Sequence, residues 1–137
     1  MKDFPLPDFE DAPASWRGRG LPVVYSCSGC SSSAQLAHYV AVQLDRRGLA
    51  RMSCIAALSA DVAQIVSDLR CASQVIAIDA CDFLCAKRAV ERHRIKPHHH
   101  YRVVARESLA GAALEDEAER IIERVLADIL RPVHGVR

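Results

Sequence analysis

The stretch VVYSCSGCSSSAQLA, Val23 to Ala37, decides the fold. An apolar, β-branched run ends at two cysteines, a glycine and a group of serines, and an apolar helical pattern then begins. This pattern predicts a buried strand over Leu21–Ser26 and an amphipathic helix over Ser31–Arg47 that ends at Gly48. Cys27 and Cys30 therefore lie in the turn between a strand and a helix.

The rest of the chain continues this alternation of strands and helices. Further strands are predicted at 50–58, 74–80 and 101–105, and further helices at 61–70 (with Asp61 as its N-cap), 82–94 (ended by Pro97) and 115–130. Near-continuous apolar strands that alternate with helices indicate a parallel sheet covered on both faces. We expect one small doubly wound, Rossmann-like α/β domain over residues 21–137, with about four parallel strands in the order 2-1-3-4. Met1–Gly20, with its three prolines, is predicted to be an N-terminal arm.

The composition excludes several classes of protein. The 137 residues are half hydrophobic and 5% aromatic, with a net charge of +1, so nothing favours nucleic acid as a partner. No apolar run approaches the ~20 residues of a membrane span, and no signal-peptide pattern is present. These features predict a cytoplasmic protein without a membrane partner, whose six cysteines stay reduced and act as metal ligands or reactive thiols.

The cysteines are the candidate functional residues. Five of the six lie toward the carboxyl ends of the predicted strands: Cys27 and Cys30 follow the first, Cys54 lies in the second half of the second, and Cys81 and Cys85 follow the third. The carboxyl ends of parallel strands meet at one edge, where ligand sites gather. Thiolates at such spacings suit zinc, copper(I) or an iron–sulfur cluster, and a following helix N-terminus would lower a thiol pKa.

Several other polar residues are candidates for a part in or near the thiol site. Asp79 and Ser28 are expected to orient a ligand or supply hydrogen bonds at the site, although Asp79 could equally cap the next helix. Cys71 falls at the opposite end of the sheet and is interpreted as a small buried hydrophobe. His98–His100 precede the last predicted strand, so a solvated turn at that opposite end is expected.

Two classes of function remain open. The first is a metal-binding protein that holds zinc as a carrier, sensor or structural centre; a closed thiolate shell argues against Lewis-acid catalysis. The second is an iron–sulfur or thiol-based redox or sulfur-transfer enzyme with Cys27 or Cys81 as nucleophile. With five thiols for four positions, either the site has an exchangeable ligand or Cys30 has a reactive or supporting part. The apolar side of the last helix could support a homodimer or a protein partner.

Three segments carry a resemblance to a known family. CSGCSSSAQLA, MSCIAALSAD and IAIDACDFLCAKRAVERH resemble the DGC-domain family, described as candidate zinc-binding proteins, over Val23 to Tyr101. The resemblance implies an α/β domain with metal ligands at Cys27, Cys54, Cys81 and Cys85. Cys30 matches the CSGCS form of members whose genes lie near denitrification genes. Ala80 replaces the signature glycine, and CIAALSAD lacks the glycines expected after Cys54, so the local loop geometry is expected to differ.

Overall fold

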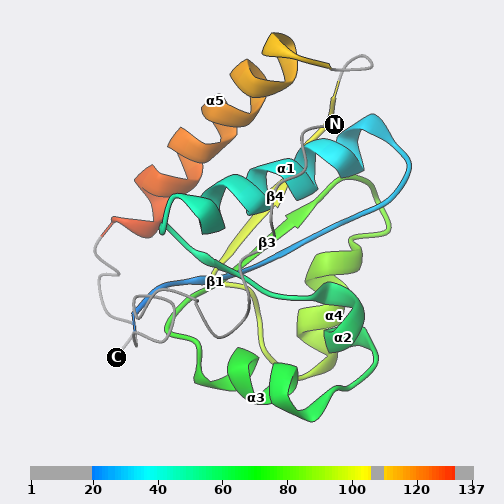
Figure 1. Cartoon of the computed structure of the whole chain (residues 1–137). Coiled ribbons are helices and arrows are strands. Elements are labelled where there is room, and N and C mark those ends of the chain that lie inside the picture. The colour runs from blue at the N-terminus through cyan, green and yellow to red at the C-terminus, as the bar shows by residue number, and fades with distance from the viewer. Residues whose placement is uncertain (1–19, 106–109, 132–137) are drawn as a thin grey trace.

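The computed structural model describes residues 20–105 and 110–131, and it contains a four-stranded sheet (Figure 1). The strands are β1 (Val23–Ser26), β2 (Arg51–Met52), β3 (Val75–Asp79) and β4 (His99–Arg102). All three pairings are parallel and the order is β2-β1-β3-β4. The predicted small α/β fold and the strand order 2-1-3-4 are therefore confirmed. The predicted arm lies outside the described residues, apart from Gly20.

Helices cover both faces of the sheet (Figure 1). On one face lie α1 (Ser32–Arg46) and α5 (Ala112–Ile129); on the other lie α2 (Ile55–Ser59), α3 (Ala63–Cys71) and α4 (Cys85–Arg92). Successive strand residues point to opposite faces, so Val24 packs under α1 while Val23 and Tyr25 pack under the other layer. None of the described helices is long and apolar enough to cross a membrane.

Helix α1 forms in the second half of the stretch Val23 to Ala37 and continues beyond it. Ser31 is its N-cap, and the Ser31 hydroxyl accepts a hydrogen bond from the Ala34 N–H at 3.1 Å. Leu36, Val40 and Leu44 are fully buried, and burial of each such side chain contributes about 1.5–3 kcal/mol. The helix ends before Gly48, whose φ of +69° favours glycine.

The second predicted strand is wrong beyond Met52. The ladder from β1 ends where the Ser53 N–H donates to the Val24 carbonyl, at 3.0 Å. Cys54 then becomes the N-cap of α2, because its sulfur accepts a hydrogen bond from the Ala57 N–H at 3.4 Å. Ala56 and Ala57 are strong helix formers and favour the short α2.

Other boundaries also differ from the predictions; α5, for example, begins at Ala112 and not at 115. Asp61 does not cap α3; it adopts a φ of +58°, and its carboxylate pairs with Arg92 at 2.6 Å. Helix α4 begins only at Cys85, because residues 81–84 form a turn that ends with Leu84 in the left-handed region. The last strand begins at His99 rather than at Tyr101 and ends at Arg102.

Candidate functional site

Five cysteines follow the carboxyl ends of strands, at one edge of the sheet. Cys27 is buried and prolongs β1, because its N–H donates to the Ile78 carbonyl at 2.8 Å. Cys30 is exposed before α1, Cys54 is exposed after β2, and Cys81 and the exposed Cys85 follow β3. Each is a free thiol.

Cys71 is not the buried hydrophobe that the sequence suggested. It is the last residue of α3, before the amino end of β3, and its side chain is exposed. The short C-terminal part of α3 leaves this position without a covering element among the described residues, whereas Leu69 in the same turn packs into the core. Cys71 is thus separated from the other five thiols by the length of the sheet.

The thiol of Cys27 is held protonated rather than activated. Burial raises its pKa, and the neighbouring Cys85 and Cys81 raise it further, against a lowering influence from the Ala80 backbone. The predicted lowering by a helix N-terminus is wrong for this residue. Helix α1 begins only at Ser32, and the effect of a helix dipole fades beyond its first turn.

The donor set fits a soft metal in its chemistry, because thiol sulfurs from three loops share one edge. Their positions do not close a site. Within residues 20–105 and 110–131, no group of three or more His, Cys, Asp or Glu side chains is arranged to hold a metal ion. Cys81 and Cys85 lie near enough to Cys27 to raise its pKa, but the three thiols do not form a ready coordination shell.

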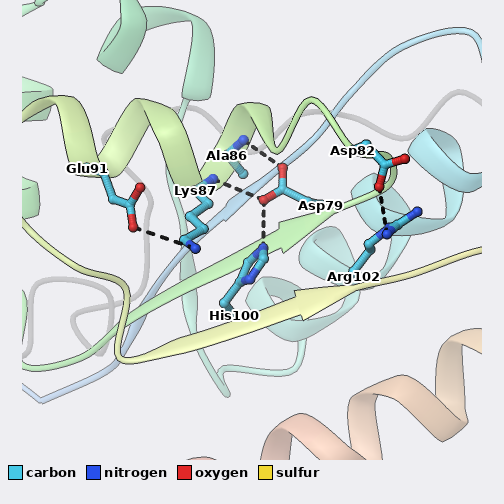
Figure 2. A network of polar contacts seen from close by, with 7 residues as sticks. All are labelled: Asp79, Asp82, Ala86, Lys87, Glu91, His100 and Arg102. Carbon is cyan, nitrogen blue, oxygen red and sulfur yellow. Dashed lines mark hydrogen bonds and ion pairs between the residues drawn. The ribbon is translucent and has the colours of Figure 1, made fainter.

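Asp79 caps α4, so the capping alternative for this residue is correct. Figure 2 shows its carboxylate facing the start of that helix. The side chain is fully buried; Oδ1 accepts from the Ala86 N–H at 2.8 Å and Oδ2 from the Lys87 N–H at 3.1 Å. Asp79 therefore fixes the helix that begins with Cys85 to the end of the strand that precedes Cys81.

His100 is a member of this network that the sequence analysis missed. Its Nε2 lies 2.9 Å from Asp79 Oδ2, and both side chains point to the α4 face of the sheet (Figure 2). The expected solvated turn at the opposite end is therefore wrong for His100. The apolar run after Tyr101 concealed the true start of β4, because an edge strand with polar residues on one face lacks an apolar pattern.

The other two histidines of the run at 98–100 also make hydrogen bonds to nearby residues. His98 Nδ1 accepts a hydrogen bond from the Val75 N–H at 3.0 Å, and His99 Nε2 lies 2.8 Å from the Gln74 side-chain oxygen. Both contacts fasten β4 to the start of β3. These two imidazoles therefore stabilise the amino end of the sheet.

A pocket lies beside β2 and is bordered by Cys54. It lies between α1, β2 and α3 and has a volume of about 570 Å³. Ser28, the serine expected to support a ligand, and His38 both line this pocket. No sequence pattern predicted the pocket, because its residues come from four separate segments.

Comparison with known proteins gives a consistent assignment. The profile of the DGC domain matches residues 23–127. A protein named "Anaerobic and virulence modulator AnvM", from Pseudomonas aeruginosa, is 39% identical over 111 residues, which cover 81% of this chain and 84% of that protein. No solved structure matches this chain significantly. With the family profile spanning the whole described sheet and both helical layers, the chain belongs to the DGC-domain family.

Proposed function

We propose that this protein binds zinc through thiolates at the carboxyl edge of its sheet. Cys27, Cys81 and Cys85 form the nucleus of the site, and Cys54 or Cys30 completes it. The observation that carries the proposal is the convergence of five free thiols on one edge, where Cys81 and Cys85 are near enough to Cys27 to raise its pKa. Zinc would crosslink the ends of β1 and β3 and so stabilise the edge.

Closure of the site requires movement of side chains, because no three are in place in the described residues. The turn at residues 81–84 and the exposed side chain of Cys85 offer that freedom. Ala80 limits it, since its methyl packs in the core where the family signature has glycine. Asp79 keeps the start of α4 fixed throughout, so the adjustment falls on the turn and not on the helix.

Binding must also displace a proton from Cys27. Because burial raises the pKa of this thiol, it is protonated at neutral pH before the metal arrives. Metal uptake therefore releases protons and strengthens as the pH rises. The positive charge of the metal ion would stabilise the buried thiolate of Cys27, which burial otherwise disfavours.

The role of such a site follows from its exposure. Cys30, Cys54 and Cys85 are exposed, so a bound metal would be accessible to another thiol donor, as a carrier or a sensor requires. The related AnvM is named as an anaerobic modulator, and we extend the setting of oxygen limitation to this chain. We place the protein in the cytoplasm, where thiols stay reduced, and link it to denitrification.

The second candidate function is an iron–sulfur or thiol-based enzyme. The partial exposure of Cys81 beside the buried Cys27 favours Cys81 as its nucleophile. The raised pKa of Cys27 disfavours Cys27 in that part, because the thiolate is the attacking species.

Elemental analysis with an ultraviolet–visible spectrum, on protein purified with and without oxygen, tests these alternatives. One zinc per chain, lost in Cys81→Ser and Cys85→Ser and kept in Cys71→Ser, would support the zinc site. Iron with labile sulfide and a visible charge-transfer band would indicate an iron–sulfur cluster and not zinc. Metal-free protein in both preparations, with Cys81 alkylated rapidly, would refute metal binding and favour the enzyme.

The same preparations test the part of Cys30. If Cys30 is an exchangeable ligand, Cys30→Ser retains zinc but transfers it to a chelator at a changed rate. Equal retention and equal transfer rates in the variant and the wild type would count against this part.

A further inference from the structure

The pocket beside β2 has an apolar part next to α3. The residues that form this part are Ile55, Ala56 and Ile65, and Asp68 of α3 lies at its border. Ile55 and Ile65 are only partly buried, and they pack against the core on the face of the sheet that α3 covers. A further apolar side chain placed on these two isoleucines would remove more of their surface from water, which is favourable.

The chain enters the described region beside this same face. Gly20 is the first described residue, and its carbonyl accepts a hydrogen bond from the Ser73 hydroxyl at 3.4 Å. Ser73 follows the last residue of α3 by two positions. Gly20 forms a turn with a φ of +139°, which glycine adopts far more readily than other residues. The N-terminal arm therefore joins the fold at the end of α3, and the arm itself lies outside the described residues.

The arm is long enough for its tryptophan to reach the pocket. Trp16 is four residues before Gly20, and four extended residues span at most about 13–14 Å. Ile65 lies six residues before Cys71, the end of α3, which is about 9 Å along the helix axis. A chain that turns at Gly20 and runs back along α3 thus brings Trp16 to the level of Ile65.

The charges beside Trp16 suit the border of the pocket. Arg17 and Arg19 follow Trp16 in the arm. Asp68 Oδ2 is 3.7 Å from Arg51 Nη1, beyond hydrogen-bond distance, and the Asp68 side chain is 29% exposed. A carboxylate has about four acceptor sites, so Asp68 can also bind a second guanidinium group.

We propose that the N-terminal arm docks on the pocket beside β2, with the Trp16 indole packed against Ile55 and Ile65. Arg17 contacts Asp68 in this arrangement. An aromatic side chain of this kind buries about 150–250 Å² of surface, so Trp16 supplies most of the apolar contact. The docked arm covers the pocket that Cys54 borders and limits access to that thiol. No metal ion takes part in this docking.

The fluorescence of Trp16 tests the docking in the full-length protein, because the chain contains no other tryptophan. We expect the emission of the native protein to lie at shorter wavelength than that of the urea-unfolded chain. Quenching by acrylamide should be several-fold weaker in the native protein. In NMR spectra, nuclear Overhauser contacts should join the indole protons to the methyl groups of Ile55 and Ile65.

Variants of the pocket test where the indole lies. Ala56 is exposed on α2 and lines the pocket, so Ala56→Glu adds a carboxylate at the docking surface without changing the core. Trp16 emission should shift toward the unfolded value in Ala56→Glu, and also in Asp68→Lys, which repels Arg17. The matched control Ala113→Glu, at an exposed position of α5, should leave the emission unchanged. Circular dichroism checks that each variant is folded.

Trp16→Ala tests the covering of the pocket. The alkylation rate of Cys54 should rise several-fold in this variant, whereas the rate of Cys85, which does not line the pocket, should stay the same. The metal content should equal that of the wild type in every variant of this set, so the outcome is independent of the proposed metal site.

Four results would overturn the proposal. The first is a native emission spectrum equal to that of the unfolded chain. The second is a shielded Trp16 that responds to neither Ala56→Glu nor Asp68→Lys. The third is an unchanged alkylation rate of Cys54 in Trp16→Ala. The fourth is shielding that appears only at high protein concentration, which would place the arm on the pocket of a second copy of the chain.

Discussion

Replacing Asp79 with alanine removes the carboxylate that joins β3, α4 and β4. The side chain is fully buried, and its two oxygens serve the Ala86 and Lys87 amides and His100 at 2.8, 3.1 and 2.9 Å. In the variant these donors lose their acceptor in a place that water reaches poorly. We therefore expect α4 to fray at its first turn, next to Cys85.

The size of the loss follows from the contacts. A missing N-cap costs about 0.5–2 kcal/mol, and a buried donor or acceptor left without its hydrogen-bond partner costs about 1–3 kcal/mol. The two effects overlap, so we expect Asp79→Ala to lower the free energy of unfolding by about 2–3 kcal/mol. Asp79→Asn keeps one acceptor oxygen and should lose about 1–2 kcal/mol.

Asp82 provides the matched control (Figure 2). It is three residues away in the same turn region, and its ion pair with Arg102 is 2.7 Å long, but its side chain is 86% exposed. Asp82→Asn should cost less than about 1 kcal/mol. Urea unfolding followed by circular dichroism measures all three variants, and the alkylation rate of Cys85 reports fraying of α4. If Asp79→Ala lost no more stability than Asp82→Asn, the capping argument would be refuted.

Three further predictions concern other parts of the molecule. Burial lowers the pKa of His99 below its ordinary value of 6.5, so on acidification the unfolded chain takes up the proton first. The urea midpoint should therefore be highest above about pH 6.5 and fall as the pH drops below it. His99→Gln should reduce this dependence of the midpoint on pH. Ile122 is 1% exposed between α5 and α1, so thermal and urea unfolding of Ile122→Ala should show a loss of about 2–5 kcal/mol, against less than about 1.5 kcal/mol for Ile122→Val. Cys71 is exposed at the far end of α3, so Cys71→Ser should leave metal content and the unfolding midpoint unchanged; a loss of metal would place Cys71 among the ligands.

Sequence patterns predicted elements where local signals and burial agree. Val75–Asp79 is apolar throughout and is a fully buried central strand, and α1 has both a serine cap and an apolar stripe. Predictions failed where a residue had more than one possible partner. Asp61 was predicted to cap a helix but bonds to Arg92, 31 positions away, and Cys54 was predicted in a strand but caps α2 with its sulfur.

The sequence by itself determined the parallel α/β fold, the strand order and the placement of five thiols at one edge. These depend on hydrophobic periodicity and on the handedness of crossovers, which act at short range along the chain. Only the tertiary structure decided the pKa of Cys27, the partners of Asp79 and His100, and the pocket beside β2. Burial and side-chain contacts between segments far apart in sequence set those properties, and no local pattern encodes them.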